Sequence, residues 1–528
     1  MCGIAGFFSN DINFEVSDKY RKILMQMKKS LYHRGPDDSG IYLNEHCGFA
    51  HTRLAIRDVR YGRQPMRRTI NNNDYVIVYN GEIYNTDILR KELKRAGWHF
   101  ESKSDTEVIL LLFLQYGPEF VKKIDGIFSF AIYDSSHAIL YLYRDQFGIK
   151  PLFYTFVKED NAIVFGSEVK ALFEYGKINA VVDSDGLNEV FGIGPARQPG
   201  NAVFKGINEL KPGNYLTCSK YGVICKEYWR LESRYHEDGY ERTIEKTKYL
   251  LEDAVVRQMV SDEEVPICTF LSGGIDSSLV SSICAAKLKE EGKRLSTYSF
   301  DFTGNEKYFK ANSFQPSQDA PYAKKMVEYL GTEHKILNCD YEIQANLLYE
   351  SIDSHDLPCM ADIDSSLIFF CREVSKNHKV VLTGECADEI FGGYPWFHRE
   401  KFLKCNTFPW TPDLSPRKQL MKSDVLEALN MDDYVGKAYE SAVKEVDILP
   451  WENKIEAERR RVSYLNIRFF MQTLLNRMDR TSMHSGLEAR VPFADKQLVQ
   501  YVFNIPWDMK ARNDMVKNVL RQAARGHV

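Results

Sequence analysis

A short buried-type strand that runs directly into a glycine turn constrains the fold of this chain more than any other feature. Residues 265–288 read VPICTFLSGGIDSSLVSSICAAKL, and residues 379–394 read KVVLTGECADEIFGGY. Each stretch reads as a strand followed by a loop, and the first continues into a helix. Repeated units of this kind form parallel sheets, which bind ligands at the carboxyl ends of their strands. We therefore expect an α/β domain with a ligand site at these two loops.

The first part of the chain has a different pattern. Short β-branched and aromatic runs such as YVIVYNGEIYN (75–85) and GIFSFAIYD (126–134) alternate with helical patterns that close on glycine, such as TDILRKELKRAG (86–97). A chain of 528 residues is also too long for one ordinary core. We predict a layered α+β domain with antiparallel sheets in residues 2–218, a polar linker in 219–240 and a second domain in 241–528, mostly helical beyond about residue 395.

Charge and cysteine usage argue against several classes of function. The 69 Lys and Arg against 73 Asp and Glu give a net charge of −4, which offers no electrostatic reason to expect nucleic acid or an acidic membrane as a partner. No apolar run reaches the length of a membrane span and no signal peptide is visible, so we expect a cytoplasmic protein. The eleven cysteines include no Cys-x-x-Cys pair, which predicts reduced thiols rather than a disulfide framework or a zinc site.

The loop LSGGIDSS predicts a phosphate site. Ser272, Gly273 and Gly274 let backbone amides approach a ligand closely, because glycine has no Cβ. Asp276 and Ser277 then open a helix, whose free N–H groups attract anions. An ordinary helix cap is the alternative, since Asp and Ser are common at helix starts. The chain has no GxxxxGK[ST] motif, so transfer of a γ-phosphate is not the expected chemistry.

The second loop, LTGECADEIFGGY, carries two acidic residues three positions apart. On a helical turn Glu385 and Asp388 would share one face, where two carboxylates repel each other unless a cation or a proton lies between them. A solvated acidic helix start is the alternative. Beside a loop that binds the phosphates of a nucleotide, we expect Asp388 to be a Mg²⁺ ligand and Glu385 to be a base or a substrate-orienting group.

The N-terminal sequence MCGIAGFF raises a second chemical possibility. Cys2 is either a small buried hydrophobe or, once Met1 is removed, a nucleophile that carries its own base in its α-amine. Acyl transfer from an amide also needs an oxyanion site, which Asn80 and the amide of Gly81 can supply. Arg53 can grip an α-carboxylate and Asp105 can pair with an α-ammonium. Taken singly, these residues also fit a hairpin turn, a surface charge and a helix cap.

Taken together, these motifs resemble known families. The SGGxDSS loop is similar to that of the N-type ATP pyrophosphatases, and Cys2 with HRGPDDSG (33–40), RLAI (53–56), NGEIYN (80–85) and SDTEV (104–108) resembles the class II glutamine amidotransferases. The whole chain resembles the glutamine-hydrolysing asparagine synthetase family, including RDQFGIKPLFY (144–154) and DRTSMHSGLEARVPFAD (479–495). The resemblance implies an N-terminal-nucleophile sandwich with αββα layers, followed by an α/β parallel-sheet ATP pyrophosphatase domain with a helical C-terminal part.

The resemblance also implies roles for particular residues. Catalysis would rest on Cys2, Asn80, Gly81, Glu385 and Lys517. Glutamine would be bound by Arg53, Asn80, Gly81, Glu82 and Asp105. ATP would be bound by Leu271, Ser272, Gly273, Gly274, Asp276, Ser277, Ser299, Gly384 and Lys517, and Mg²⁺ by Asp276 and Asp388.

The implied reaction is hydrolysis of glutamine coupled to amidation of aspartate through an acyl-adenylate. Glutamine, aspartate and ATP would be the small-molecule substrates, Mg²⁺ the metal, and a homodimer a possible assembly. Two alternatives remain open: the same chemistry on another carboxylate acceptor, such as a cell-wall, peptide or β-lactam precursor, and a truncated relative without catalysis. The loop reads GECADE where many family members have GEGSDE, and the family usually continues several tens of residues beyond the last helix.

Overall fold

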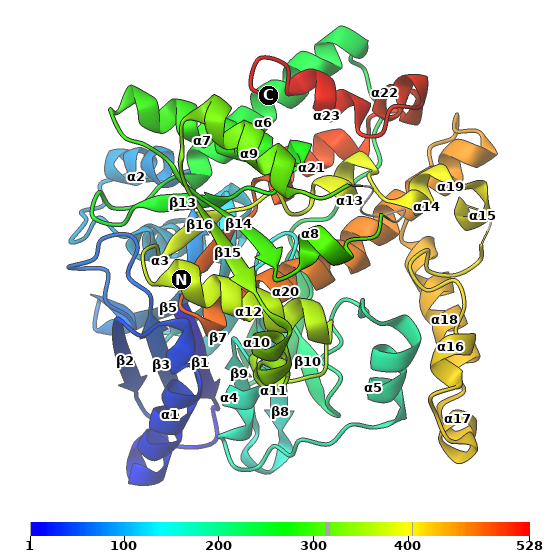
Figure 1. Ribbon diagram of the computed structural model, residues 1–528. Coiled ribbons are helices and arrows are strands. Elements are labelled where there is room, and N and C mark those ends of the chain that lie inside the picture. Colours follow the sequence, from blue (N-terminus) through cyan, green and yellow to red (C-terminus); the bar gives the residue numbers. More distant parts are fainter. Residues whose placement is uncertain (1, 312–316, 404) are drawn as a thin grey trace.

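Two antiparallel sheets stack face to face in the N-terminal half of the computed structural model, which describes residues 2–311, 317–403 and 405–528 (Figure 1). The first sheet has the strand order β10 (Ile207–Glu209), β8 (Phe153–Val157), β9 (Ala162–Gly166), β1 (Cys2–Phe8), β3 (Cys47–Arg53) and β2 (Asp38–Leu43). The second has the order β12 (Gly222–Glu227), β11 (Asn214–Ser219), β7 (Ile139–Arg144), β6 (Gly126–Asp134), β5 (Asn73–Ile83) and β4 (Met66–Ile70).

Helices cover the outer faces of both sheets. The facing sides of the sheets enclose one apolar cluster that includes Ile4, Phe8, Val76 and Ala131. Helix α1 (Asp18–Ser30) packs on the first sheet, with α4 (Val169–Phe173) beside it. Helices α2 (Thr86–Arg95) and α3 (Asp105–Tyr116) pack on the second sheet. The predicted αββα sandwich is confirmed.

A parallel sheet forms the centre of the second half. Its order is β15 (Glu333–Cys339), β14 (Ser296–Phe302), β13 (Ile267–Phe270), β16 (Val380–Leu382) and β17 (Glu488–Arg490). The larger helices around it are α6 (Tyr240–Gln258), α7 (Ile275–Glu290), α9 (Ala320–Leu330), α11 (Leu348–His355), α12 (Ala361–Ser375), α20 (Met471–His484) and α21 (Lys496–Phe503). The predicted α/β parallel-sheet domain is confirmed, and β17 is a strand that the sequence did not predict.

The described residues beyond about 395 are mostly helical, as predicted, and β17 is a strand among them. On the right of Figure 1 lie α14 (Pro395–His398), α15 (Glu400–Leu403), α16 (Ser415–Lys418), α17 (Ser423–Leu429), α18 (Met431–Lys444) and α19 (Lys454–Leu465). The chain ends at the top of the same view with α22 (Trp507–Lys510) and α23 (Asn518–Ala523), close to α6.

The two halves share a continuous core rather than a thin contact. One apolar cluster contains Leu54 and Ile127 from the sandwich together with Leu251, Leu382 and Met483 from the second half. The predicted linker 219–240 begins inside the β11–β12 hairpin, because residues 222–227 still pair with β11 in the second sheet. The connection between the halves therefore runs from residue 228 to the start of α6 at residue 240.

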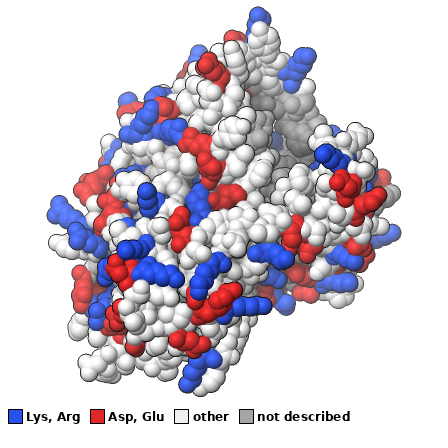
Figure 2. Space-filling view, turned by 90° about the horizontal axis from the view of Figure 1, so that it is seen from below, with Lys and Arg blue, Asp and Glu red and all other residues white. Residues whose placement is uncertain are grey.

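The surface shows no segregation of charge on the face viewed in Figure 2, where Lys and Arg side chains are interspersed with Asp and Glu. This mixture agrees with the net charge of −4. Among the described residues, none of the helices has both the length and the apolar character needed to cross a bilayer. None of the eleven cysteines, all of which lie in the described residues, is paired in a disulfide.

Candidate active sites

Cys2 is the first residue of β1 and lies in the interior of the molecule. In the antiparallel pairing of β1 with β3, Cys2 stands opposite Arg53, which brings together two residues that are far apart in sequence. The Cys2 side chain is only 7% exposed, and burial raises the pKa of its thiol. The backbone nitrogen of Cys2 donates to Asn80 Oδ1 at 3.0 Å. The sandwich therefore places the candidate nucleophile where β1 and β3 of one sheet meet β5 of the other.

Asn80 presents a free donor beside Cys2. It is fully buried in β5, and its Nδ2 atom has no hydrogen-bond partner among the residues that the structure describes. A buried unpaired amide costs about 1–3 kcal/mol, so such a group is expected to have a partner in the working site. Gly81 follows in the same strand, where a Cβ would lie 2.2 Å from the carbonyl oxygen of Ile127. The close approach of β6 thus requires glycine at this position.

Arg53 and Asp105 are both held by neighbouring backbone. The Arg53 guanidinium donates to the carbonyl oxygens of Val59 at 3.0 Å and Asp58 at 2.7 Å, which fixes it at the loop that follows β3. Asp105 is the first residue of α3, and its Oδ2 atom accepts from the Ile83 amide at 3.1 Å. Both side chains are 5% exposed. Each is therefore set in one orientation, as a binding group for a small charged ligand needs to be.

Glu82 differs from the other predicted glutamine ligands because it contacts two arginines, one of them from the second half. It contacts Arg57, and Arg490 of the second half approaches its Oε2 atom at 3.5 Å. Burial raises the pKa of the Glu82 carboxyl to about 8 against the attraction of these two arginines. The structure thus links the predicted glutamine site to β17, which carries Arg490. Sequence reasoning missed Arg57 and Arg490, because nothing in the local pattern marks them.

The glycine loop has the form that the sequence predicts. Helix α7 begins at Ile275, with Gly274 as its N-cap. Ser272 and Ser277 close the loop, because their hydroxyl oxygens lie 3.0 Å apart and the Ser272 amide donates to Ser277 Oγ at 3.1 Å. Gly273 has a φ of +84°, and a Cβ there would lie 2.3 Å from the amide nitrogen of Ala323. Glycine is thus required at the point where the loop turns.

Lys517 joins the two acidic residues that were predicted to hold a metal. Its Nζ atom lies 2.7 Å from Asp276 Oδ2 and 2.6 Å from Asp388 Oδ1. Burial lowers the pKa of Lys517, but the two carboxylates outweigh it and raise that pKa above its ordinary value. The buried atom Asp276 Oδ1 has no hydrogen-bond partner in the described part of the chain. Burial, with Asp388 adding to it, raises the pKa of Asp276 to about 6.

The predicted shared face of Glu385 and Asp388 is wrong. Helix α13 begins at Ala387 and ends at Phe391, and Cys386 before it has a φ of +77°. This left-handed residue breaks the helical path, so Glu385 lies outside the helix while Asp388 lies in its first turn. Glu385 instead accepts a hydrogen bond from Arg477 Nη2 at 3.1 Å.

A cavity of about 790 Å³ unites the predicted residues of the second half. Its wall includes most of the predicted ATP and acceptor residues: Leu271, Ser272, Gly274, Asp276, Ser277, Ser299, Gly384, Glu385 and Asp388. Gly273 and Lys517 are not among the lining residues, but Lys517 contacts two that are, Asp276 and Asp388. Sequence reasoning missed Arg477, Glu389 and Tyr394, which also line the cavity. Tyr394 donates to Glu389 at 2.5 Å, and burial raises the pKa of Glu389 to about 8.

Comparison with protein families divides the chain into two parts. Residues 1–229 match the glutamine amidotransferase domain, and residues 246–528 match asparagine synthase. The second match alone covers more than half of the chain. The boundary between the two matches falls in the connection that precedes and enters α6.

Several curated proteins are similar over the whole chain. Glutamine-hydrolyzing asparagine synthetase 3 of Bacillus subtilis (strain 168) is 46% identical over 528 residues, which cover 100% of this chain and 84% of the relative. Glutamine-hydrolyzing asparagine synthetase 1 of the same organism is 30% identical, covering 100% and 85%. Amidase chyE of Penicillium rubens is 27% identical, covering 100% and 87%. Among solved structures, the allosteric regulatory enzyme of purine biosynthesis aligns with a TM-score of 0.33 at 16% identity, covering 64% of this chain and 80% of its own.

Proposed function

Because this chain belongs to the family of glutamine-hydrolysing asparagine synthetases, we propose that it makes asparagine from aspartate, with glutamine as the nitrogen donor and ATP as the energy source. The observation that carries this proposal is the pairing of two dissimilar sites in one molecule. In one half Cys2 lies against an unpaired buried amide of Asn80. In the other half a glycine loop opens into a cavity that is lined by carboxylates.

In the first half-reaction, the Cys2 sulfur attacks the side-chain carbonyl carbon of glutamine. The α-amine of Cys2, which is freed by removal of Met1, takes the thiol proton and passes it to the leaving nitrogen. The C–N bond breaks, ammonia leaves and a thioester remains. Asn80 Nδ2 and the Gly81 amide donate to the oxygen that gains negative charge. Water then cleaves the thioester to give glutamate and the free thiol. Arg53 and Asp105 bind the α-carboxylate and α-ammonium of glutamine.

In the second half-reaction, the side-chain carboxylate of aspartate attacks the α-phosphorus of ATP and pyrophosphate leaves. Ser272, Gly274 and Ser277 surround the pyrophosphate with backbone and hydroxyl donors. Ammonia then attacks the acyl carbon and AMP leaves. Glu385 accepts the proton that the attacking nitrogen gives up, and Lys517 balances charge on the phosphates.

Asp276 and Asp388 fit a Mg²⁺ ion. Their carboxylates converge on one cation, the Lys517 ammonium, and Asp276 keeps a buried oxygen that has no partner among the described residues. Hard oxygen ligands of this kind suit Mg²⁺. When bound, the ion would offset the triphosphate charge.

An apolar cluster lies between the two sites, and ammonia would cross it. The shared cluster includes Leu54, next to Arg53, and Cys386, next to Glu385. Neutral ammonia can move through such surroundings more readily than a charged ion can. We further propose that the protein is cytoplasmic and forms a homodimer.

One variant tests the division of labour. Cys2→Ala is expected to abolish asparagine formation from glutamine while it retains formation from added ammonium chloride. Loss of both activities would contradict the assignment. Exchange of labelled pyrophosphate into ATP, compared for aspartate and for other carboxylic acids, tests the acceptor. The proposal of aspartate fails if aspartate is inert and another acid supports exchange.

A further inference from the structure

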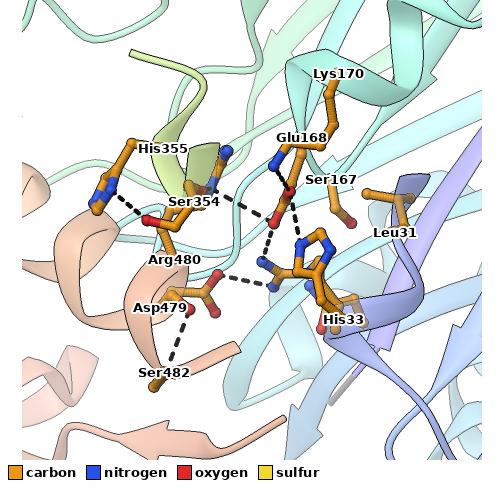
Figure 3. Close-up of polar contacts among 12 residues, drawn as sticks. Leu31, His33, Ser167, Glu168, Lys170, Ser354, His355, Asp479, Arg480 and Ser482 are labelled. Atoms are coloured by element: carbon orange, nitrogen blue, oxygen red, sulfur yellow. Dashed lines mark hydrogen bonds and ion pairs between the residues drawn. The ribbon is translucent and has the colours of Figure 1, made fainter. Parts of the chain in front are cut away.

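A cluster of buried charges lies where the two halves meet (Figure 3). At its centre, Glu168 accepts from Arg34 Nη1 at 2.9 Å and contacts His33 Nε2 at 3.0 Å and Lys170 Nζ at 3.2 Å. The side chains of Glu168 and Arg34 are fully buried. Removal of one partner from a buried ion pair leaves an uncompensated charge and destabilises the folded protein by about 3–5 kcal/mol.

Arg34 connects this cluster to the nucleophile. Its Nε atom donates to the carbonyl oxygen of Cys2 at 3.1 Å, Nη1 donates to Glu168, and Nη2 donates to Asp479 Oδ2 at 2.8 Å. A guanidinium is a rigid planar fork, so its donors cannot move independently. The position of the Cys2 carbonyl is therefore tied to the positions of two carboxylates.

Asp479 comes from the other half of the molecule. It lies on α20, 445 positions from Arg34 in the sequence, and is 3% exposed. Its second oxygen accepts from Lys150 Nζ at 3.0 Å. Burial alone raises the pKa of Asp479, but the charges of Arg34 and Lys150 outweigh it and hold that pKa below the ordinary value. The carboxylate is thus ionised and fixed from two sides.

We propose that Asp479 is a positioning residue of the glutaminase reaction: through Arg34 it fixes the carbonyl of Cys2, and with it the direction of the thiol. Glu168 accepts only from Nη1 of Arg34, so the Nη2 end of the guanidinium is fixed by Asp479. The inference rests on the proposed function of Cys2. It assigns part of the glutaminase geometry to the synthetase half, which also holds Glu385 through Arg477, two positions earlier on α20.

The test compares Asp479→Asn with a matched control, Asp356→Asn. Asp356 belongs to the same cluster and accepts from Arg480 Nη2 at 2.6 Å. Each substitution therefore removes one buried carboxylate from an arginine, but of these two carboxylates only that of Asp479 contacts Arg34. We expect Asp479→Asn to lower the kcat of glutamine hydrolysis about 10- to 100-fold, since a misplacement of about 1 Å has such effects. The KM for glutamine should stay within about twofold, because Arg53 and Asp105 are untouched.

Two further measurements separate positioning from loss of structure. Ammonium-dependent asparagine synthesis, measured on the same preparations, should change no more in Asp479→Asn than in Asp356→Asn. Arg34→Lys keeps the charge but loses the fork, and it should repeat the loss of glutaminase kcat if Asp479→Asn does not fold. The inference is overturned if both carboxylate variants lose glutaminase equally, or if Asp479→Asn loses both activities in parallel. A wild-type chain that does not hydrolyse glutamine would instead overturn the proposed function.

Discussion

Gly393 offers a sharp test of the proposed Mg²⁺ site at Asp276 and Asp388. A Cβ added to Gly393 would lie 1.7 Å from Asp388 Oδ1, 2.7 Å from Asp388 Cγ and 2.5 Å from Lys517 Cε. Non-bonded heavy atoms in contact are about 3.5–4.0 Å apart, so both side chains must retreat by at least about 1 Å. The backbone itself tolerates alanine here, because Gly393 is not among the positive-φ glycines. Gly393→Ala should therefore displace two predicted ligands of ATP and Mg²⁺ and leave the fold intact.

The expected result is a loss of about 100-fold in aspartate-dependent exchange of labelled pyrophosphate into ATP, the usual effect of a 1 Å misplacement. Glutamine hydrolysis by the same preparation should be unchanged, because Cys2 lies in the other half. Gly436→Ala is the control, since a Cβ there meets nothing within 4 Å and alanine favours a helix by roughly 0.5–1 kcal/mol. Full exchange activity in Gly393→Ala would refute the placement of Asp388 and Lys517 at the reacting phosphates.

Three further outcomes follow from the same geometry. Asn80→Ala should lower the kcat of glutamine hydrolysis by about 10²–10³-fold with little change in KM, measured as glutamate release; a change in KM alone would contradict the oxyanion role. Chelation of Mg²⁺ with EDTA should abolish pyrophosphate exchange and spare glutamine hydrolysis, whereas exchange that survives would exclude Asp276 and Asp388 as metal ligands. Burial, with Arg460 adding to it, lowers the pKa of Lys510 to about 7 in the folded protein. Above pH 7 the lysine is therefore protonated in the unfolded chain but largely neutral in the folded one. The free energy of unfolding consequently rises with pH, by up to ~1.4 kcal/mol per pH unit. Lys510→Met should remove this rise, and thermal midpoints of both proteins at pH 7, 8 and 9 should converge; a constant difference would contradict it.

The sequence alone allowed the local shape to be predicted where a feature is built from one short motif. The Ser272–Ser277 loop is built from adjacent residues, and its glycine and serine chemistry decides its shape locally. The relation of Cys2 to Asn80 spans 78 positions and could be predicted only because the family resemblance linked the two motifs. The prediction that Glu385 and Asp388 share a helical face was wrong for a local reason. Cys386 adopts a left-handed conformation that L-residues rarely adopt, and a spacing rule does not foresee it.

Strand β17 and the buried charges of α20 could not be predicted, because both depend on contacts between segments that are far apart in the sequence. Strand β17 is only three residues long and has the charged sequence EAR, so no alternation of apolar residues marks it. Its place in the sheet comes from parallel pairing with β16. Asp479 and Arg480 are charged residues that are buried because α20 packs against the sandwich, and no local pattern in the sequence shows that contact.

The buried charges also explain why the two activities share one chain. Arg34 and Lys150 of the sandwich meet Asp479 of the second half, and Glu168 of the sandwich lies 3.6 Å from Arg480 of the second half. Separation of the halves would leave each of these groups without a partner from across the boundary, and the shared apolar cluster would be exposed with them. The same contact that makes separation costly fixes the carbonyl of Cys2 through Arg34. The geometry that releases ammonia is therefore complete only when the half that consumes ammonia is docked beside it.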